Sequence, residues 1–184
     1  FLPAYTFPEK AASGYLGSNM NEAFANNSFI IESYAPTPTR GISKETREKY
    51  KNIKVEKFYD GKMTLHRFSM FQEGKNVVQR AFRYLMCFCC HYYYGIKSQN
   101  VSCIFLASTP PIQGMLGAFL KKMKKVPFVY NLQDIFPDSL VNNGLAKKGG
   151  LLWKIGRVIE NFTYKHADKI IVISEDFKKN IMAK

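Results

Sequence analysis

The sequence lacks the short motifs that mark most self-contained catalytic sites. It has no G-x-x-x-x-G-K-[ST] loop and no G-x-G-x-x-G turn, so neither a P-loop nucleotide hydrolase nor a dinucleotide-binding enzyme is indicated. The G-x-S-x-G turn that presents a nucleophilic serine is missing as well. The three histidines, His66, His91 and His166, are scattered singly rather than at metal-ligand spacing. We therefore expect structural histidines, and neither a bound metal ion nor another cofactor.

Acidic residues are also scarce, with 14 Asp and Glu against 27 Lys and Arg and a formal net charge of +13. Such a charge attracts polyanions, which include nucleic acid, an anionic membrane surface and phosphate-bearing substrates. A membrane-spanning helix is not predicted, because the longest uncharged apolar stretch, residues 84–96, is shorter than the roughly 18 residues that a span requires. The hydrophobic content of 46% is nevertheless enough to build a core.

The four cysteines do not form a spaced framework, because three of them crowd into residues 87–90. Reduced thiols in a cytoplasmic protein are therefore expected. Residues 87–91 formally match the C-x-x-C-H haem-attachment pattern, but they lie within an aromatic, helical run, so no haem is predicted.

Short apolar runs alternate with helical patterns along the chain. The predicted strands are residues 29–34, 63–68, 103–107, 128–132 and 169–173. The predicted helices are residues 76–94, 111–122, 151–162 and a final one from an N-cap at Ser174 to residue 184. In the third helix a helical period predicts one buried apolar face, made of Leu151, Leu152, Ile155, Val158, Ile159 and Phe162. This alternation indicates an α/β fold with a Rossmann-like parallel sheet flanked by helices.

Size and patterning predict a single domain over residues 1–184. Residues 37–60 are charged and poorly periodic, so we expect a surface excursion there, disordered in part. The opening residues have no strand-length run before them, and a first strand is expected to be missing.

Candidate site residues lie where strands end, because ligands of open parallel sheets bind beyond the carboxyl ends of the strands. Asp134 directly follows an apolar strand, and its carboxylate is the best candidate to accept a proton or hold a sugar hydroxyl. Candidate substrate-binding residues are Glu9, Ser108, Pro110, Asp138, Ser139, Ser174 and Glu175. For the acidic residues the alternative is a helix cap or a turn.

A run of lysines lies at and just after the end of the helix predicted over residues 111–122: Lys121, Lys122, Lys124 and Lys125. Together with the aromatic run at residues 82–94, it suggests peripheral docking to an anionic bilayer, where each basic residue contributes about 1 kcal/mol. A solvated helix end is the alternative, and a nucleic-acid-binding surface is not expected.

Four segments resemble, in order, the N-terminal half of family 4 glycosyltransferases of the GT-B fold, of the type that assembles bacterial surface polysaccharides such as capsule or O-antigen. They are residues 7–12 (FPEKAA), 107–111 (ASTPP), 129–139 (VYNLQDIFPDS) and 167–175 (ADKIIVISE). The first resembles a Pro-Glu loop after the first strand, and the third a strand followed by Asp, an aromatic residue, Pro, an acidic residue and Ser.

The resemblance implies retaining transfer from a nucleotide-activated sugar, without a metal, to an acceptor that is often lipid-linked. Asp134 falls near the family's polar strand-end residue, which faces the reacting sugars. The family's glycine pair in the first loop is replaced by residues 10–13 (KAAS), which puts contact with the donor phosphate there in doubt. A donor-binding domain would follow Lys184, so the 184 residues alone are expected to be inactive.

Two alternatives stay open. The chain could be a natural half-enzyme or membrane-recruiting subunit that completes its site with a separate donor-domain partner, or a basic nucleic-acid-binding domain. The sequence does not choose the sugar, the nucleotide or the acceptor.

Overall fold

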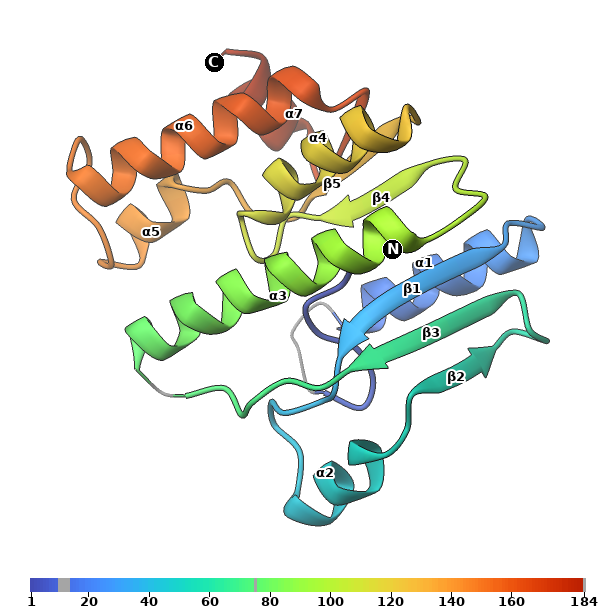
Figure 1. Ribbon diagram of the computed structural model, residues 1–184. Helices are drawn as coiled ribbons and strands as arrows, with labels where there is room; N and C mark the ends of the chain where they lie inside the picture. Colours follow the sequence, from blue (N-terminus) through green and yellow to red (C-terminus); the bar gives the residue numbers. More distant parts are fainter. Residues whose placement is uncertain (10–13, 75, 184) are drawn as a thin grey trace. The chain divides into compact units, whose positions relative to one another are not determined.

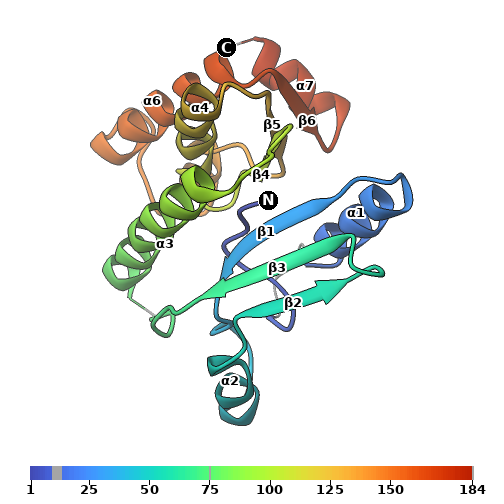
Figure 2. The same ribbon diagram turned by 45° about the vertical axis from the view of Figure 1, so that its right-hand side comes forward.

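The computed structural model describes residues 1–9, 14–74 and 76–183. The chain divides into two compact units, which we call the N-terminal unit (Phe1–Gly95) and the C-terminal unit (Ile96–Lys184). Each unit contains one three-stranded sheet with parallel pairing and helices packed against it (Figures 1 and 2). The predicted α/β class is thereby confirmed, whereas the expectation of a single domain over the whole chain stays a prediction.

The N-terminal unit contains the first three helices and the first three strands. They are α1 (Gly14–Asn26), β1 (Ile31–Pro36), α2 (Lys44–Lys51), β2 (Val55–Phe58), β3 (Met63–Phe68) and α3 (Val77–Lys97), whose last turn passes the boundary between the units. The sheet order is β1-β3-β2, with β1 parallel and β2 antiparallel to the central strand. The carboxyl ends of β1 and β3 therefore lie at the same edge of this sheet.

Both faces of this sheet are covered. One face buries Ile31, Ala35, Met63 and Leu65 beneath the Phe24 ring of α1. On the opposite face Phe68 packs with Cys87 and with the Tyr94 ring of α3, which lies 5.6 Å from it. Alternation along the strands thus supplies apolar side chains to both faces, as expected for a parallel sheet between helices.

The segment at residues 37–60, expected to be a partly disordered excursion, contains α2 and β2. The α2 helix begins at Ser43, whose hydroxyl accepts a hydrogen bond from the Thr46 amide at 3.1 Å. Only Tyr50 of this helix is buried, and β2 is an edge strand with alternately exposed residues. Neither element is predicted from the sequence, because neither carries a periodic apolar face.

The C-terminal unit contains the other strands and helices. They are β4 (Ile104–Ala107), α4 (Gln113–Lys124), β5 (Phe128–Leu132), α5 (Asp138–Asn142), α6 (Leu151–His166), β6 (Lys169–Val172) and α7 (Glu175–Met182). The strand order is β4-β5-β6 and both pairings are parallel, with Ala107 opposite Asn131 and Leu132 opposite Val172. The three predicted strands of this unit are confirmed.

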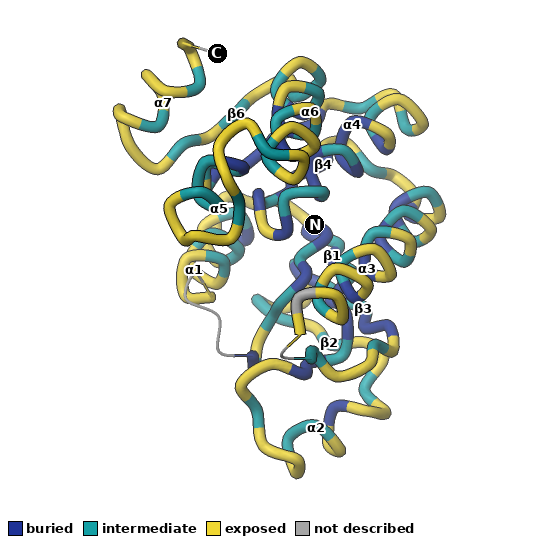
Figure 3. Tube along the Cα trace, turned by 90° about the vertical axis from the view of Figure 1, so that its left-hand side faces the viewer, coloured by how far each residue is buried: buried dark blue, intermediate teal, exposed yellow. Residues whose placement is uncertain are grey.

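The predicted buried face of α6 is wrong. Four of its six residues are exposed: Leu151, Leu152, Ile155 and Val158. The buried residues of the helix are instead Gly156, Glu160 and Thr163, and all its other residues are exposed or half-buried (Figure 3). Small residues allow this choice, because a Cβ added to Gly156 would lie only 2.6 Å from the Cβ of Pro137. Close backbone approach, rather than the apolar stripe, selects the inward face.

The cysteines are free, and Cys87 is fully buried against His91, with burial raising the pKa of its thiol to about 12. Within residues 1–9, 14–74 and 76–183, no group of His, Cys, Asp and Glu side chains is arranged to hold a metal ion. In the same residues, no helix combines the length and apolar character needed to cross a bilayer.

Candidate functional site

The three strands of the C-terminal unit end at one edge, where the sequence placed its best candidates. Ser108 follows β4 and is buried, and its amide donates to the Asn131 carbonyl at 3.0 Å. Its hydroxyl accepts a hydrogen bond from the Gln133 amide at 3.0 Å. Ser108 therefore fastens the end of β5, and its hydroxyl holds the start of the loop that carries Asp134.

Asp134 is exposed on this loop, five residues before Ser139. Its Oδ2 accepts a hydrogen bond from the Ser139 hydroxyl at 3.0 Å, and the Ser139 amide donates to the Ile135 carbonyl at 2.9 Å. Among the described residues no donor contacts its Oδ1. The structure thus holds this carboxylate from one side and leaves the other oxygen able to accept a proton or a hydroxyl.

Asp138, at the start of α5, is tied to α6 by two donors. Its Oδ1 accepts hydrogen bonds from the Trp153 indole at 3.3 Å and from Arg157 Nη2 at 2.7 Å. Arg157 also stacks over the Trp153 ring, with 4.8 Å from its guanidinium carbon to the ring centroid. These two hydrogen bonds to Asp138 brace the segment after β5 against α6, and Arg157 is itself held by donating to Glu160 on the same helix. A carboxylate in such a brace positions the loop and is less suited to bind substrate.

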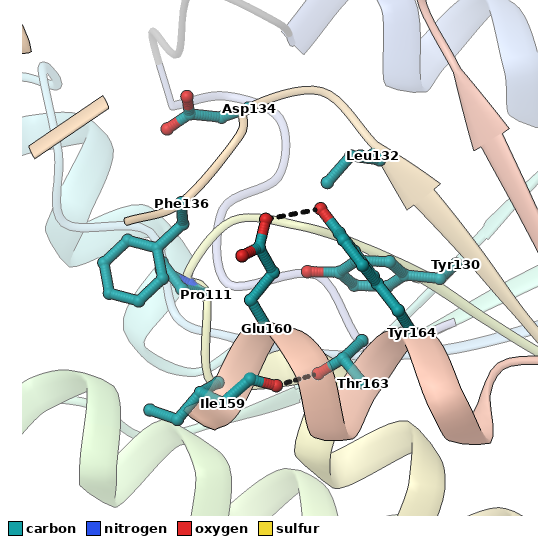
Figure 4. A pocket seen from close by; sticks show the side chains of 9 residues that line it. All are labelled: Pro111, Tyr130, Leu132, Asp134, Phe136, Ile159, Glu160, Thr163 and Tyr164. Carbon is teal, nitrogen blue, oxygen red and sulfur yellow. Dashed lines mark hydrogen bonds between the residues drawn. The ribbon is translucent and has the colours of Figure 1, made fainter. Parts of the chain in front are cut away.

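A small hollow opens beside the loop, with a volume of about 220 Å³ that includes solvent at its mouth. Figure 4 shows the nine side chains that line it: Pro111, Tyr130, Leu132, Asp134, Phe136, Ile159, Glu160, Thr163 and Tyr164. Glu160 is the buried carboxylate at its centre, with 2% of its side chain exposed, and Tyr164 donates to it at 3.0 Å. The hydroxyl of Tyr130 is turned toward the same carboxylate.

The two tyrosines of the hollow are held neutral. Burial, reinforced by the charge of Glu160, raises the pKa of both Tyr130 and Tyr164 well above the ordinary tyrosine value. Both hydroxyls therefore stay protonated near neutral pH and act only as hydrogen-bonding groups. Because Glu160 already accepts from Arg157 and Tyr164, Asp134 is the carboxylate of the hollow best placed to act on a ligand.

Three other candidates take structural positions in the C-terminal unit. Pro110 is fully buried in the turn before α4. The Ser174 hydroxyl caps α7 by accepting a hydrogen bond from the Phe177 amide at 3.3 Å. Glu175 is exposed, and its Oε2 lies 3.7 Å from Lys178 Nζ. The alternative interpretation, a helix end, accounts for the contacts of Ser174 and Glu175.

Glu9 belongs to the N-terminal unit, and its buried carboxylate is surrounded by backbone amides. Oε1 accepts from Thr39 N at 2.8 Å and Arg40 N at 2.9 Å, while Oε2 accepts from Thr6 N at 3.2 Å. Burial raises the pKa of Glu9, although these hydrogen bonds oppose the rise. In this arrangement Glu9 shapes the loop rather than offering a free carboxylate. The adjoining replacement of the family's glycines, residues 10–13, lies outside the described residues.

The four lysines at the end of α4 divide into two pairs. Lys121 donates to Asp168 at 2.7 Å and to the His166 carbonyl at 3.0 Å, and this ion pair lowers the pKa of Asp168. Lys124 donates to the Ser98 carbonyl. Lys122 and Lys125 are exposed. Two of the predicted membrane-contact residues thus have side-chain partners within their own unit, and for the other two the described part of that unit offers none.

Sequence analysis missed the polar residues of α6 that brace the loop. Trp153, Arg157, Glu160 and Tyr164 recur at spacings of three and four, which places them along one face of the helix. This polar stripe is a detectable signal in the sequence, but the apolar stripe beside it is stronger and predicts a different buried face.

Comparison with known proteins gives one informative similarity. No family model matches the chain. Over 82 residues, or 45% of its length, the chain is 24% identical to the protein named "Probable glycosyltransferase WbjE" of Pseudomonas aeruginosa. The matched segment covers 20% of that protein, so the chain spans about a fifth of the length of the curated relative it matches. The chain is therefore similar, over less than half of its residues, to a protein named as a probable glycosyltransferase.

Proposed function

We propose that the chain is the acceptor-binding part of a retaining glycosyltransferase of the GT-B, family 4 type. The observation that carries the proposal is the exposed Asp134 carboxylate at the carboxyl end of β5, on a loop fastened by Ser139 and by the Asp138–Arg157 ion pair. The similarity to a glycosyltransferase supports the same reaction class. The fold supports it as well, because strand ends of open α/β sheets are where such ligands bind.

In this proposal a nucleotide-sugar donates its sugar to a hydroxyl of a lipid-linked saccharide in polysaccharide synthesis. The acceptor oxygen forms a bond to the anomeric carbon, and the bond from that carbon to the nucleotide's phosphate oxygen breaks. Asp134 Oδ1 accepts a hydrogen bond from the attacking hydroxyl. This bond orients the hydroxyl, and the carboxylate takes up the proton of the hydroxyl as it attacks. The neutral Tyr130 and Tyr164 hydroxyls and the Glu160 carboxylate form the polar floor of the hollow.

Binding can be mapped on the chain as it stands by amide NMR. Adding a water-soluble farnesyl-diphospho-sugar is expected to shift the amide resonances of Asp134, Ile135 and Ser139 in a saturable way. The matched control is farnesyl diphosphate without the sugar, which should leave these three resonances in place. If the sugar-bearing compound moves no resonance of the loop, acceptor binding at this strand end is refuted.

Peripheral association with the inner face of a membrane is a further part of the proposal. It rests on exposed Lys122 and Lys125, next to Met123, whose side chain is 58% exposed. Anionic headgroups attract such lysines, and an exposed apolar side chain adds to the attraction.

Replacing Lys122 and Lys125 by Gln should weaken binding to vesicles containing phosphatidylglycerol about 10- to 30-fold at low salt, because each lysine contributes about 1 kcal/mol. Sedimentation with the vesicles measures it. The matched control is the pair Lys121→Gln and Lys124→Gln, whose amines are already bound to protein acceptors. This control pair should lower the melting temperature, and it should weaken vesicle binding less than the replacement of Lys122 and Lys125 does. Equal losses of affinity in the two double variants would contradict the assignment.

A further inference from the structure

A cluster of charged and aromatic side chains lies in the N-terminal unit, beside the buried carboxylate of Glu9. Thr39 and Arg40 follow the carboxyl end of β1, and Glu73 follows that of β3. Arg83 reaches the cluster from α3, and Tyr5 from the opening segment. Because β1 and β3 are parallel, the cluster gathers at the sheet edge where ligands of α/β folds bind.

Two guanidinium groups converge on the Tyr5 ring. The guanidinium carbons of Arg40 and Arg83 lie 5.1 Å and 5.0 Å from its centroid. Arg40 is exposed, whereas Arg83 is fully buried. The Tyr5 hydroxyl donates to Glu73 at 3.0 Å, and burial raises its pKa well above the ordinary value, so the ring stays neutral. The cluster therefore holds two cations close together, one of them within reach of solvent.

The carboxylates of the cluster are already satisfied by other donors. Glu9 accepts from three backbone amides. Glu73 accepts from Arg80 Nε at 2.9 Å and from Tyr5. Burial acts to raise the pKa of Glu73, but these two hydrogen bonds and the charges of Arg40 and Arg83 together outweigh it, so the pKa is lowered and the carboxylate is ionised at neutral pH. Among the described residues, neither glutamate accepts a hydrogen bond from Arg83 Nε or Nη1.

Arg83 is the member of the cluster without enough partners. Its Nη2 reaches Thr39 Oγ1 at 3.4 Å, the outer limit of a hydrogen bond. Its Nε and Nη1 are buried and donate to no acceptor in the residues that the structure describes. The nearby charge of Glu9 and the Tyr5 ring offset part of the cost of burying the cation. They do not replace the missing hydrogen bonds, and burying a donor without an acceptor costs free energy.

We propose that Arg83 and Arg40 bind an oxyanion, the phosphate group of a phosphate ester or diphosphate. A guanidinium presents N–H groups in a planar fork that matches phosphate oxygens, and charge-assisted hydrogen bonds of this kind are among the stronger ones in proteins. The bound phosphate satisfies the donors of Arg83, while exposed Arg40 supplies a second positive charge. This site is built from residues of the N-terminal unit alone and shares no residue with the proposed sugar site around Asp134.

The test is a titration of the chain with inorganic pyrophosphate at constant ionic strength, followed by calorimetry and thermal melting. Saturating pyrophosphate is expected to raise the melting temperature of the wild type by several degrees. Arg83→Met should lower the affinity at least about tenfold, as expected for lost charge-assisted hydrogen bonds. Lys49→Met, which removes one charge from the exposed side of α2, is the matched control and should keep wild-type affinity. A wild type that does not respond to pyrophosphate, or equal losses in both variants, overturns the site.

A second comparison separates binding from a purely structural role of Arg83. Without ligand, Arg83→Met is expected to melt at or above the wild-type temperature, because a buried cation without full hydrogen bonding is removed. Should that variant fail to fold, Arg83→Lys keeps the charge but loses the planar fork, and it should lose most of the response to pyrophosphate. A full response in Arg83→Lys would refute the role of the guanidinium.

The same titration distinguishes two sources of the phosphate. UDP and farnesyl diphosphate carry the same diphosphate on a nucleotide or on a lipid. Tighter binding of one of them than of pyrophosphate, lost in Arg83→Met, supports the site and identifies the source. Binding of either compound that is unchanged in Arg83→Met contradicts it. The amide resonances of residues 134–139 report binding of the sugar, whereas the pyrophosphate titration reports binding at Arg83 and Arg40. Either site can therefore fail its test without the other.

Discussion

Asp134→Asn is expected to lower the turnover of sugar transfer about 100-fold or more, the usual size of a lost proton-accepting or orienting group. The measurement requires a form of the protein that includes the donor-binding part, because the proposal assigns only the acceptor side to these residues. Asparagine keeps an oxygen that can accept from Ser139, but it cannot take up a proton. Since Asp134 is exposed, the melting temperature should stay within about 2 °C of wild type, as for ordinary surface substitutions.

The matched control for this prediction is Asp138→Asn, four residues further along the chain at the start of α5. Asp138 is held by Arg157 and Trp153, so its replacement weakens the brace between the loop and α6. We expect a lower melting temperature and a higher KM, with a smaller effect on turnover than in Asp134→Asn. Unchanged turnover in Asp134→Asn would remove this carboxylate from the reaction and leave Glu160 as the other carboxylate that lines the hollow.

Gly114→Ala is expected to cost about 2–4 kcal/mol of unfolding free energy, although it adds only one methyl group. A Cβ at this position would lie 2.8 Å from the Cβ of Thr163 and closer still to its Oγ1 and Cγ2. Thr163 cannot easily turn aside, because a β-branched side chain is stiff and its hydroxyl donates to the Ile159 carbonyl at 2.8 Å. The close packing of α4 on α6 depends on this glycine, and urea unfolding measures the loss.

Two further variants test the cause of that loss. Thr163→Ala removes the nearest atoms, so the double variant should recover part of the stability lost in Gly114→Ala, a coupling of about 0.5–3 kcal/mol for residues in contact. Gly17→Ala is the matched control, because a Cβ there meets nothing within 4 Å. In the interior of α1 it should raise stability by about 0.5–1 kcal/mol. Equal effects of the two glycine replacements would mean that helix propensity, and not packing, decides the outcome.

The strands of the C-terminal unit were predictable because each is a short, nearly continuous apolar run. Residues 103–107 and 128–132 enclose β4 and β5, and Ser174 caps α7 as expected. In contrast, α2 and β2 could not be predicted from periodicity, because their stability comes from one cap, one buried tyrosine and pairing to β3. Such tertiary contacts leave little trace in a local pattern.

The position of Asp134 followed from sequence, but its partners did not. A strand followed by an aspartate predicts a carboxylate at the sheet edge, whichever fold surrounds it. The brace of Arg157 and Glu160 depends on which face of α6 turns inward, and that is decided by Gly156 and by Gly114 across the helix pair. The unsatisfied donors of Arg83 are likewise invisible in sequence, because they result from how three segments close around one side chain.

Transfer itself is the most direct test of the central claim, that the β5 strand end is the acceptor side of a retaining sugar-transfer site. A protein containing this chain and its donor-binding part is incubated with labelled nucleotide-sugars and a polyprenyl-diphospho-saccharide. Mass spectrometry follows the addition of sugar, and NMR reports the anomeric configuration of the product. We expect one added sugar per acceptor, release of the nucleotide, and the same anomeric configuration in product and donor. An inverted product, or no transfer from any nucleotide-sugar, would contradict it.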